Sequence, residues 1–134
     1  MKHKKPTLGV LLGDSSGIGP EIVAKLISRP EIYELANVVI VGDYRVFRIG
    51  QKIAGLSEPV TVTDHLDSVP FEIGRPVFYD YPTISDEEVT MGKVNPKSGK
   101  AVMNTLSFMV DLALAKKIDW FVFAPFNKEA MILW

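Results

Sequence analysis

The sequence predicts an α/β protein with a mostly parallel sheet and flanking helices. Short apolar runs, which suit strands buried on both faces, alternate with longer amphipathic stretches that suit helices. Most of these apolar runs are followed by glycine or proline, which is typical of strand ends. We expect strands over residues 7–13, 37–41, 60–63, 76–79 and 119–124, and helices over residues 19–28, 44–54 and 98–117.

The first strand and the first helix are joined by residues 13–21, with the sequence GDSSGIGPE. Residues 7–13 are almost continuously apolar and end at a glycine, which predicts a buried strand. The helix that follows begins with a proline in its first turn and stops before Pro30. Its apolar residues fall on one predicted face. These residues are Ile22, Val23, Leu26 and Ile27.

The remaining elements follow the same logic. Residues 37–41 (NVVIV) predict a second buried strand, and the helix after it ends at Gly55. Five prolines interrupt the middle of the chain, so only two short strands are expected there. Apolar residues recur at helical spacing over 98–117, and the sequence DWFVFA after them predicts a fully buried strand.

Composition excludes several classes of protein. The 134 residues are 47% hydrophobic and 23% charged, with a net charge of −1, which argues against a nucleic-acid partner held by charge. The absence of cysteine excludes disulfides, thiolate catalysis and cysteine-based zinc sites, and fits the cytoplasm. No segment approaches the roughly 20 apolar residues that span a bilayer, and the first apolar run is too short for an export signal. We therefore expect no membrane association.

The loop over residues 13–21 is the best candidate for a binding site. Backbone N–H groups at a helix N-terminus can hold an anion, and ligands of parallel sheets gather at strand carboxyl ends. The glycine spacing G-x-x-x-G-x-G is neither the dinucleotide fingerprint nor a P-loop. The loop can cradle a phosphate or a nicotinamide ribose, or it is only a tight turn. Asp14 either orients a ligand hydroxyl or accepts hydrogen bonds from that turn, and Asp43 occupies the position of a ribose-binding acid.

A second polar motif, APFNK over residues 124–128, follows the last strand. In a parallel sheet it shares an edge with the first loop, so Lys128 can meet a phosphate or carboxylate. The alternative is a helix start capped by Asn127 with a solvated lysine. His3 and His65 are isolated from each other, and we predict no catalytic triad and no histidine metal site.

With these two motifs the chain resembles the N-terminal part of the 4-hydroxythreonine-4-phosphate dehydrogenase family of vitamin B6 biosynthesis. Relatives in that family oxidise threonate and erythronate 4-phosphates. The resemblance rests on GD…GIGPE over residues 13–21 and on APFNKEA over residues 124–130, in the same order. It implies the fold of isocitrate and isopropylmalate dehydrogenases, here incomplete. Ser15 and Phe123 depart locally from the family pattern.

The resemblance also implies a chemistry. It is the oxidation of a phosphorylated hydroxy acid, such as 4-hydroxythreonine 4-phosphate, by NAD (or NADP) with a divalent metal ion in a homodimer. It places Asp14, Gly17, Ile18 and Gly19 near the cofactor. It places Asn127 and Lys128 near the substrate. The family's metal-binding and catalytic residues lie beyond Trp134, so neither role is assigned to any residue of this chain.

The resemblance further implies that residues 1–134 are the N-terminal portion of a longer two-domain protein. Residues 1–124 would be a segment of the first domain and residues 125–134 the start of a helix cut short. Sheet edges and core faces are then expected to be exposed unless chains associate. We expect the chain alone to be inactive. The alternative is a non-catalytic module that binds a phosphorylated ligand or serves assembly.

Overall fold

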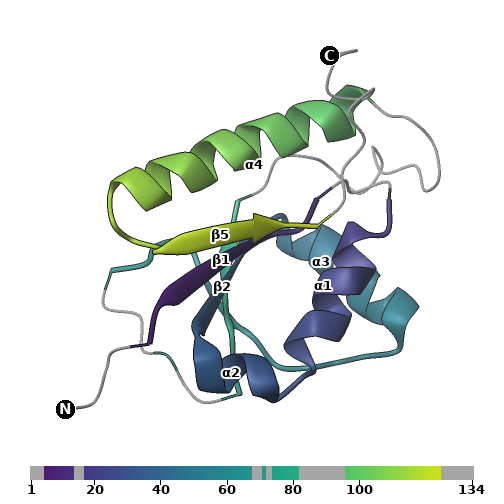
Figure 1. The fold of residues 1–134 in the computed structure, drawn as a ribbon. Helices are drawn as coiled ribbons and strands as arrows, with labels where there is room; N and C mark the ends of the chain where they lie inside the picture. The colour runs from purple at the N-terminus through teal and green to yellow at the C-terminus, as the bar shows by residue number, and fades with distance from the viewer. Residues whose placement is uncertain (1–4, 14–16, 68–70, 72–73, 82–95, 125–134) are drawn as a thin grey trace.

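The computed structural model describes residues 5–13, 17–67, 71, 74–81 and 96–124. They form five strands and four helices (Figure 1). In chain order these are β1 (Thr7–Leu11), α1 (Gly19–Ile27), α2 (Glu31–Leu35), β2 (Asn37–Gly42), α3 (Tyr44–Ala54), β3 (Thr61–Thr63), β4 (Val77–Asp80), α4 (Pro96–Leu114) and β5 (Trp120–Phe123).

The strands form one sheet in the order β3-β4-β2-β1-β5, and all four pairings are parallel. Helices α1 and α3 cover one face of the sheet, and α4 covers the other (Figure 1). Each strand is connected to the next through helix or loop, as parallel pairing requires. The predicted α/β class with a parallel sheet and flanking helices is confirmed.

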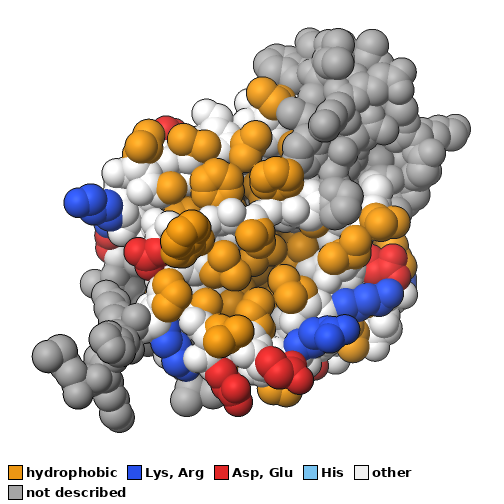
Figure 2. Space-filling view, in the orientation of Figure 1, with side chains coloured by type: hydrophobic (Ala, Val, Ile, Leu, Met, Phe, Trp, Pro, Cys, Tyr) orange, Lys and Arg blue, Asp and Glu red, His pale blue; other side chains and the backbone are white. Residues whose placement is uncertain are grey.

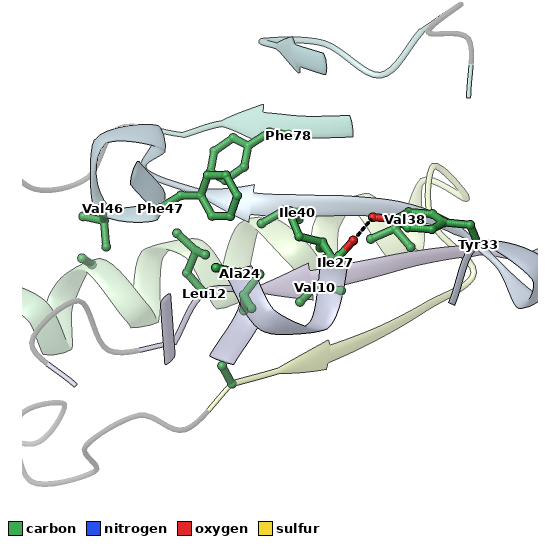
Figure 3. Packing of buried hydrophobic residues seen from close by; sticks show 13 residues of the cluster. Val10, Leu12, Ala24, Ile27, Tyr33, Val38, Ile40, Val46, Phe47 and Phe78 are labelled. Atoms are coloured by element: carbon green, nitrogen blue, oxygen red, sulfur yellow. Dashed lines mark hydrogen bonds between the residues drawn. The ribbon is translucent and has the colours of Figure 1, made fainter. Parts of the chain in front are cut away.

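Two separate cores lie on the two faces of the sheet. On the α1 and α3 face, the rings of Phe47 and Phe78 lie 5.0 Å apart between centroids (Figure 3). On the α4 face, Met109 is fully buried against Val39 and Val41 of β2. The central strands are buried on both faces, which is why their sequences are continuously apolar rather than alternating.

Helix α4 differs from its prediction at both ends. It begins at Pro96, two residues before the predicted start, and ends at Leu114 instead of residue 117. Its end is set by Lys116, which adopts a left-handed conformation with φ of 60°. The Lys117 N–H then donates to Leu112 O at 2.9 Å and the Lys116 N–H to Ala113 O at 3.1 Å, which is the Schellman pattern of a helix end.

Helix α2 is not predicted by the sequence pattern. Pro30 marks the stop of α1, and the same proline is also the N-cap residue of α2. Proline suits a helix start because its φ is already near the helical value. Glu31 in the first turn favours the helix dipole. Burial of Tyr33 against the core holds this five-residue helix in place.

The buried face of α1 also differs from the prediction. Ile22 is 40% exposed, whereas Pro20, Val23, Ala24 and Ile27 are buried. The buried positions follow i, i+3, i+4 and i+7 from Pro20, a stripe that includes the small residue Ala24. A prediction that counts only large apolar side chains overlooks small buried residues such as Ala24. It therefore assigns Ile22 to the buried face by mistake.

The prediction that β5 is fully buried is wrong. Trp120 is 70% exposed and Phe123 is 53% exposed. The reason is topological, because β5 lies at the edge of the sheet beside β1. An apolar strand at a sheet edge is buried only if another element covers that edge.

The close approach of α1 and α3 depends on Gly50. A β-carbon at Gly50 would lie 2.4 Å from the carbonyl carbon of Pro20 and 2.6 Å from its oxygen, and neither backbone atom can swing aside. We expect Gly50→Ala to lower the free energy of unfolding by about 3 kcal/mol, measured by urea denaturation. In Gly55→Ala the new β-carbon meets nothing within 4 Å and only the left-handed φ of 69° is strained, so about 1 kcal/mol is expected. An unchanged or increased stability of Gly50→Ala would contradict this packing.

Tyr33 ties α2 to the end of α1 and predicts a pH dependence. Its hydroxyl donates to Ile27 O at 2.6 Å, and burial, with the charge of Glu58, raises the pKa of Tyr33 from 10 to about 12. Since the folded pKa is the higher one, the neutral phenol contributes stability that is complete below pH 10 and lost as pH rises to about 12. The loss is roughly 2–3 kcal/mol.

Tyr33→Phe removes that titration. We expect the variant to cost about 1 kcal/mol at neutral pH, through the lost hydrogen bond. Between pH 10 and about 12 its unfolding free energy should fall less steeply than that of the parent chain. Urea denaturation across this pH range is the measurement. Parallel losses in the two proteins would show that Tyr33 does not carry the effect.

Candidate functional site

The carboxyl ends of β1 and β2 meet at one edge of the sheet, where parallel α/β sheets bind their ligands. A pocket of 330 Å³, including the part open to solvent, is formed there beneath the first half of α4. Its lining includes Leu12 and Gly13 after β1, Gly42 and Asp43 at the end of β2, and Ala101 and Thr105 of α4. The pocket is mainly apolar, with the carboxylate of Asp43 as its charged group.

The turn after β1 brings the start of α1 against the strand end. Gly13 has a φ of 83°, which favours glycine, and the chain then returns so that Gly19 is buried. A β-carbon at Gly19 would lie 2.1 Å from the Leu12 carbonyl oxygen. Only glycine therefore allows α1 to begin so close to β1, and this explains one of the two glycines of the GIG motif in structural terms.

Within the part of the chain that the structure describes, no side chain caps the first turn of α1. The N-cap residue Ile18 is 58% exposed and its aliphatic side chain makes no capping hydrogen bond. Pro20, in the first turn, has no N–H to donate. The N–H groups at this helix start and the positive end of the helix dipole are suited to a negatively charged group.

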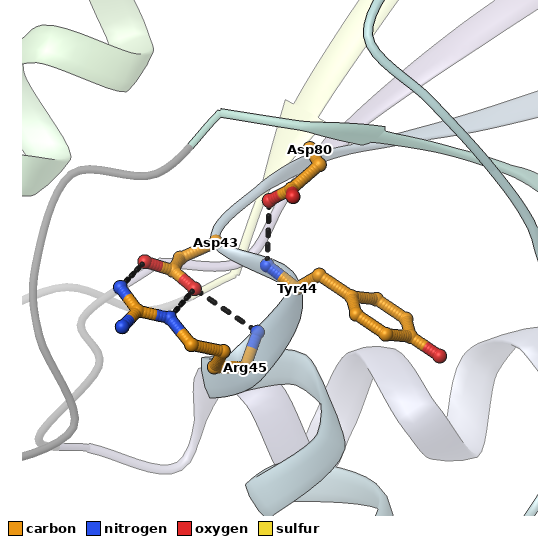
Figure 4. A network of polar contacts seen from close by, with 4 residues as sticks. All are labelled: Asp43, Tyr44, Arg45 and Asp80. Atoms are coloured by element: carbon orange, nitrogen blue, oxygen red, sulfur yellow. Dashed lines mark hydrogen bonds and ion pairs between the residues drawn. The ribbon is translucent and has the colours of Figure 1, made fainter.

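The start of α3 has the opposite chemistry (Figure 4). Asp43 is its N-cap and accepts a hydrogen bond from the Arg45 N–H at 3.0 Å. Asp80, at the end of β4, accepts one from the Tyr44 N–H at 3.1 Å. Two carboxylates of the protein itself therefore occupy this helix N-terminus, which disfavours an additional anion there.

Asp43 is further fixed by Arg45. The guanidinium contacts both carboxylate oxygens, with Nε 3.1 Å from Oδ1 and Nη2 2.8 Å from Oδ2 (Figure 4). Asp43 is only 4% exposed. A side chain that is buried, capping and paired in this way is poorly placed to bind a ribose, so its position at a strand end has a structural explanation.

The second sequence motif begins beside the first loop. The Ala124 N–H donates to Leu11 O at 3.1 Å, and the Ala124 β-carbon lies 3.2 Å from the β-carbon position of Gly19. The start of α1 at Gly19 and the first residue of the second motif, Ala124, therefore lie at a common edge of the sheet. Asp14, Asn127 and Lys128 lie outside the described residues.

Sequence reasoning missed two contributors to this edge. Arg45 pairs with the Asp43 carboxylate. Its position two residues after an N-cap aspartate is the sequence signal that could have indicated this pairing. Thr105 lines the pocket, and its hydroxyl already donates to Ala101 O at 2.7 Å. Nothing in the sequence indicates that the middle of α4 crosses the ends of β1 and β2, because this depends on how the helix packs.

The described part of the chain supplies no metal centre. No group of three or more histidine, cysteine, aspartate or glutamate side chains converges there. Among the same residues, no helix is both long and apolar enough to cross a bilayer.

Comparison with known proteins gives a consistent result. The sequence profile of the family described as pyridoxal phosphate biosynthetic protein PdxA matches residues 34–133. A proposed D-threonate 4-phosphate dehydrogenase of Clostridium botulinum is 30% identical over 98% of this chain and 39% of its own length. A proposed 4-hydroxythreonine-4-phosphate dehydrogenase of Pasteurella multocida is 36% identical over 95% of this chain and 38% of its own length.

A solved structure agrees with these sequences. The crystal structure of a 4-hydroxythreonine-4-phosphate dehydrogenase from Burkholderia phymatum superimposes with a TM-score of 0.89 at 26% identity. The match covers 97% of this chain and 39% of that one. The chain thus spans about two fifths of the length of the relatives that it matches.

The network at the start of α3 predicts a graded response to substitution. Asp43→Ala removes the cap and the ion pair together and is expected to cost about 2 kcal/mol of unfolding free energy. Asp43→Asn keeps a good capping oxygen and loses only the pairing with a half-exposed Arg45, so about 0.5–1 kcal/mol is expected. Urea denaturation measures both. Equal losses for the two variants would show that charge, rather than capping, dominates.

Proposed function

The chain belongs to the PdxA family of pyridoxal phosphate biosynthetic proteins, and we propose that it supplies the cofactor-side part of an NAD-dependent dehydrogenase of a phosphorylated hydroxy acid. The substrate class includes 4-hydroxythreonine 4-phosphate. The proposal includes a divalent metal ion, and a homodimer in the cytoplasm. The observation that carries it is the start of α1, which is held at the carboxyl end of β1 and whose N-cap residue Ile18 makes no capping hydrogen bond with its side chain, in a chain of this family.

The chemistry of the α1 start supports the cofactor assignment. A dinucleotide carries negatively charged phosphates, and Gly17, Ile18 and Gly19 supply backbone N–H groups at the start of α1. At the start of α3, by contrast, the Tyr44 and Arg45 N–H groups already donate to Asp80 and Asp43. Asp14 completes this loop in the proposal. When bound, the nicotinamide ring accepts a hydride from the carbinol carbon of the substrate. The part played by these residues is to hold and orient the cofactor.

The described residues do not fit a metal site, since they bring no three suitable side chains together. We therefore derive no step that depends on a metal bound by them. For the substrate, we assign Asn127 and Lys128, which follow Ala124 in the sequence by three and four residues. Ala124 itself lies at the same sheet edge as the start of α1. A lysine there is suited to the phosphate or carboxylate of a phosphorylated hydroxy acid.

A first test is whether the chain by itself catalyses the reaction. We expect the purified 134-residue chain to form no NADH from NAD and 4-hydroxythreonine 4-phosphate with added Mg²⁺ or Zn²⁺, because the described residues bring no three metal-ligating side chains together. The NADH absorbance is the readout, and an intact relative such as the Pasteurella multocida protein is the control for the assay. Turnover by the chain above background would contradict its assignment as an incomplete enzyme.

Calorimetry with NAD, and separately with the phosphorylated substrate, distinguishes the proposed function from the alternative module. If the chain binds the phosphorylated substrate saturably but does not bind NAD, the result favours a phospho-ligand-binding module. Binding of NAD that Gly19→Ala abolishes supports the proposal, because that substitution displaces the start of α1 from β1. No binding of either ligand, together with tight self-association, favours an assembly role.

A further inference from the structure

We propose that a cavity at the amino end of the sheet, where the parallel strands begin, binds a small aromatic phosphate monoester between Lys5 and Arg75. This cavity, called the amino-end cavity below, has a volume of about 390 Å³, including the part open to solvent. The candidate cofactor site lies at the opposite end, where β1 and β2 finish. The inference therefore goes beyond the proposed function and does not depend on it.

The amino-end cavity is formed by segments that are distant in the sequence. Lys5 precedes β1, Asn37 is the first residue of β2, and Tyr33 belongs to α2. Phe71 and Arg75 both come from the connection between β3 and β4. Helix α2 and the N-terminus lie at this end of the sheet in Figure 1. The parallel topology thus gathers these side chains at one place, as it gathers the two sequence motifs at the other end.

Two cationic side chains line the cavity, and neutral oxygens hold them in place. The Lys5 ammonium donates to Tyr33 O at 2.7 Å, and the Arg75 guanidinium donates to Thr61 Oγ1 at 3.0 Å. Within the described ranges, neither cation forms an ion pair with a carboxylate, and no residue that lines the cavity is acidic. Because an ammonium has three N–H donors and a guanidinium five, both can still donate to an anion.

The rest of the lining is suited to a flat apolar ring. Val38 is 1% exposed and Ala36 is 8% exposed, so the packing of the core fixes this part of the wall. Phe71 presents an aromatic ring that is 38% exposed, and aromatic rings pack favourably against one another. A phosphate monoester carries about two negative charges at neutral pH, which matches the two cations. A phosphorylated aromatic ring therefore satisfies both parts of the cavity.

A wider groove at the same end of the sheet shares Lys5 with the amino-end cavity, and its acidic side chains are already engaged. Asp119 Oδ2 accepts a hydrogen bond from the Thr7 N–H at 2.8 Å, and Asp67 is paired with Lys117. Figure 2 shows basic and acidic side chains near one another at this end of the molecule, whereas hydrophobic ones cover its middle. The groove carboxylates thus have partners of their own, which leaves the cations of the cavity available to a ligand.

Binding of phenyl phosphate to the purified chain tests the proposal, with inorganic phosphate and phenol as the two halves of the probe. Backbone amide chemical shifts of the ¹⁵N-labelled chain locate the site. We expect saturable shifts at Asn37 and Val38, and a Kd for phenyl phosphate at least about tenfold lower than for either half. The absence of saturable binding at millimolar concentration would overturn the proposal. So would shifts confined to the start of α1.

Substitutions connect the binding to the cavity. Lys5→Gln and Arg75→Gln each remove one positive charge but keep an amide N–H for the neutral acceptor, and each should raise the Kd of phenyl phosphate about tenfold. Lys25→Gln is the matched control, because it removes the same charge from a side chain of α1 that lines neither the cavity nor the groove. Its Kd should equal that of the parent chain. Phe71→Leu should weaken the binding of phenyl phosphate and leave that of inorganic phosphate unchanged.

Three further outcomes would overturn the proposal. They are an equal change of Kd in all three charge variants, an unchanged Kd in both cavity variants, and binding of phenol or inorganic phosphate as tight as that of phenyl phosphate. Thermal unfolding shows whether each variant folds, and the shifts of the parent chain test the site without any substitution. NAD is titrated separately and followed at Gly17 and Gly19. NAD shifts there without phenyl phosphate shifts at Asn37 support the proposed function and contradict the amino-end cavity, and the opposite pattern does the reverse.

Discussion

The arrangement of the whole α1 and α3 face depends on two backbone approaches that only glycine permits. Gly19 lies against the Leu12 carbonyl, which holds the start of α1 to the end of β1. Gly50 lies against Pro20, which holds α3 to that same turn of α1. The first contact also sets the α1 start beside Ala124 at the end of β5. The ends of β1 and β5 and the start of α1 are thereby gathered at one edge of the sheet.

At that edge the two helix N-termini differ in a way that decides where a ligand can bind. The start of α3 is occupied by the carboxylates of Asp43 and Asp80, and Asp43 is also held by Arg45. The start of α1 has an aliphatic N-cap residue and a proline in its first turn. A negatively charged group is therefore disfavoured at the start of α3 and favoured at the start of α1. The family relationship and this asymmetry both support our proposal that the cofactor binds on the α1 side of the edge.

Many elements could be predicted because their local signals agree with their surroundings. The bounds of α3 follow from an N-cap aspartate and the left-handed Gly55, and both signals act within a few residues. The errors occurred where the environment decides. Ile22 is apolar but lies off the buried stripe of α1, and β5 is apolar but lies at an edge. The shared sheet edge was predictable as well, since Gly19 of the first motif lies beside Ala124 of the second.

The sequence alone therefore determined the alternation of strands and helices, the two motifs at strand ends and the family to which they point. These depend on local periodicity, turns and caps, which neighbouring residues control. Only the tertiary structure decided that Asp80 of β4 adds a second carboxylate at the start of α3, that α4 closes the pocket through Ala101 and Thr105, and that β5 is left exposed. Each of these depends on which elements become neighbours across the sheet, and contacts between distant segments leave no periodic trace in the sequence.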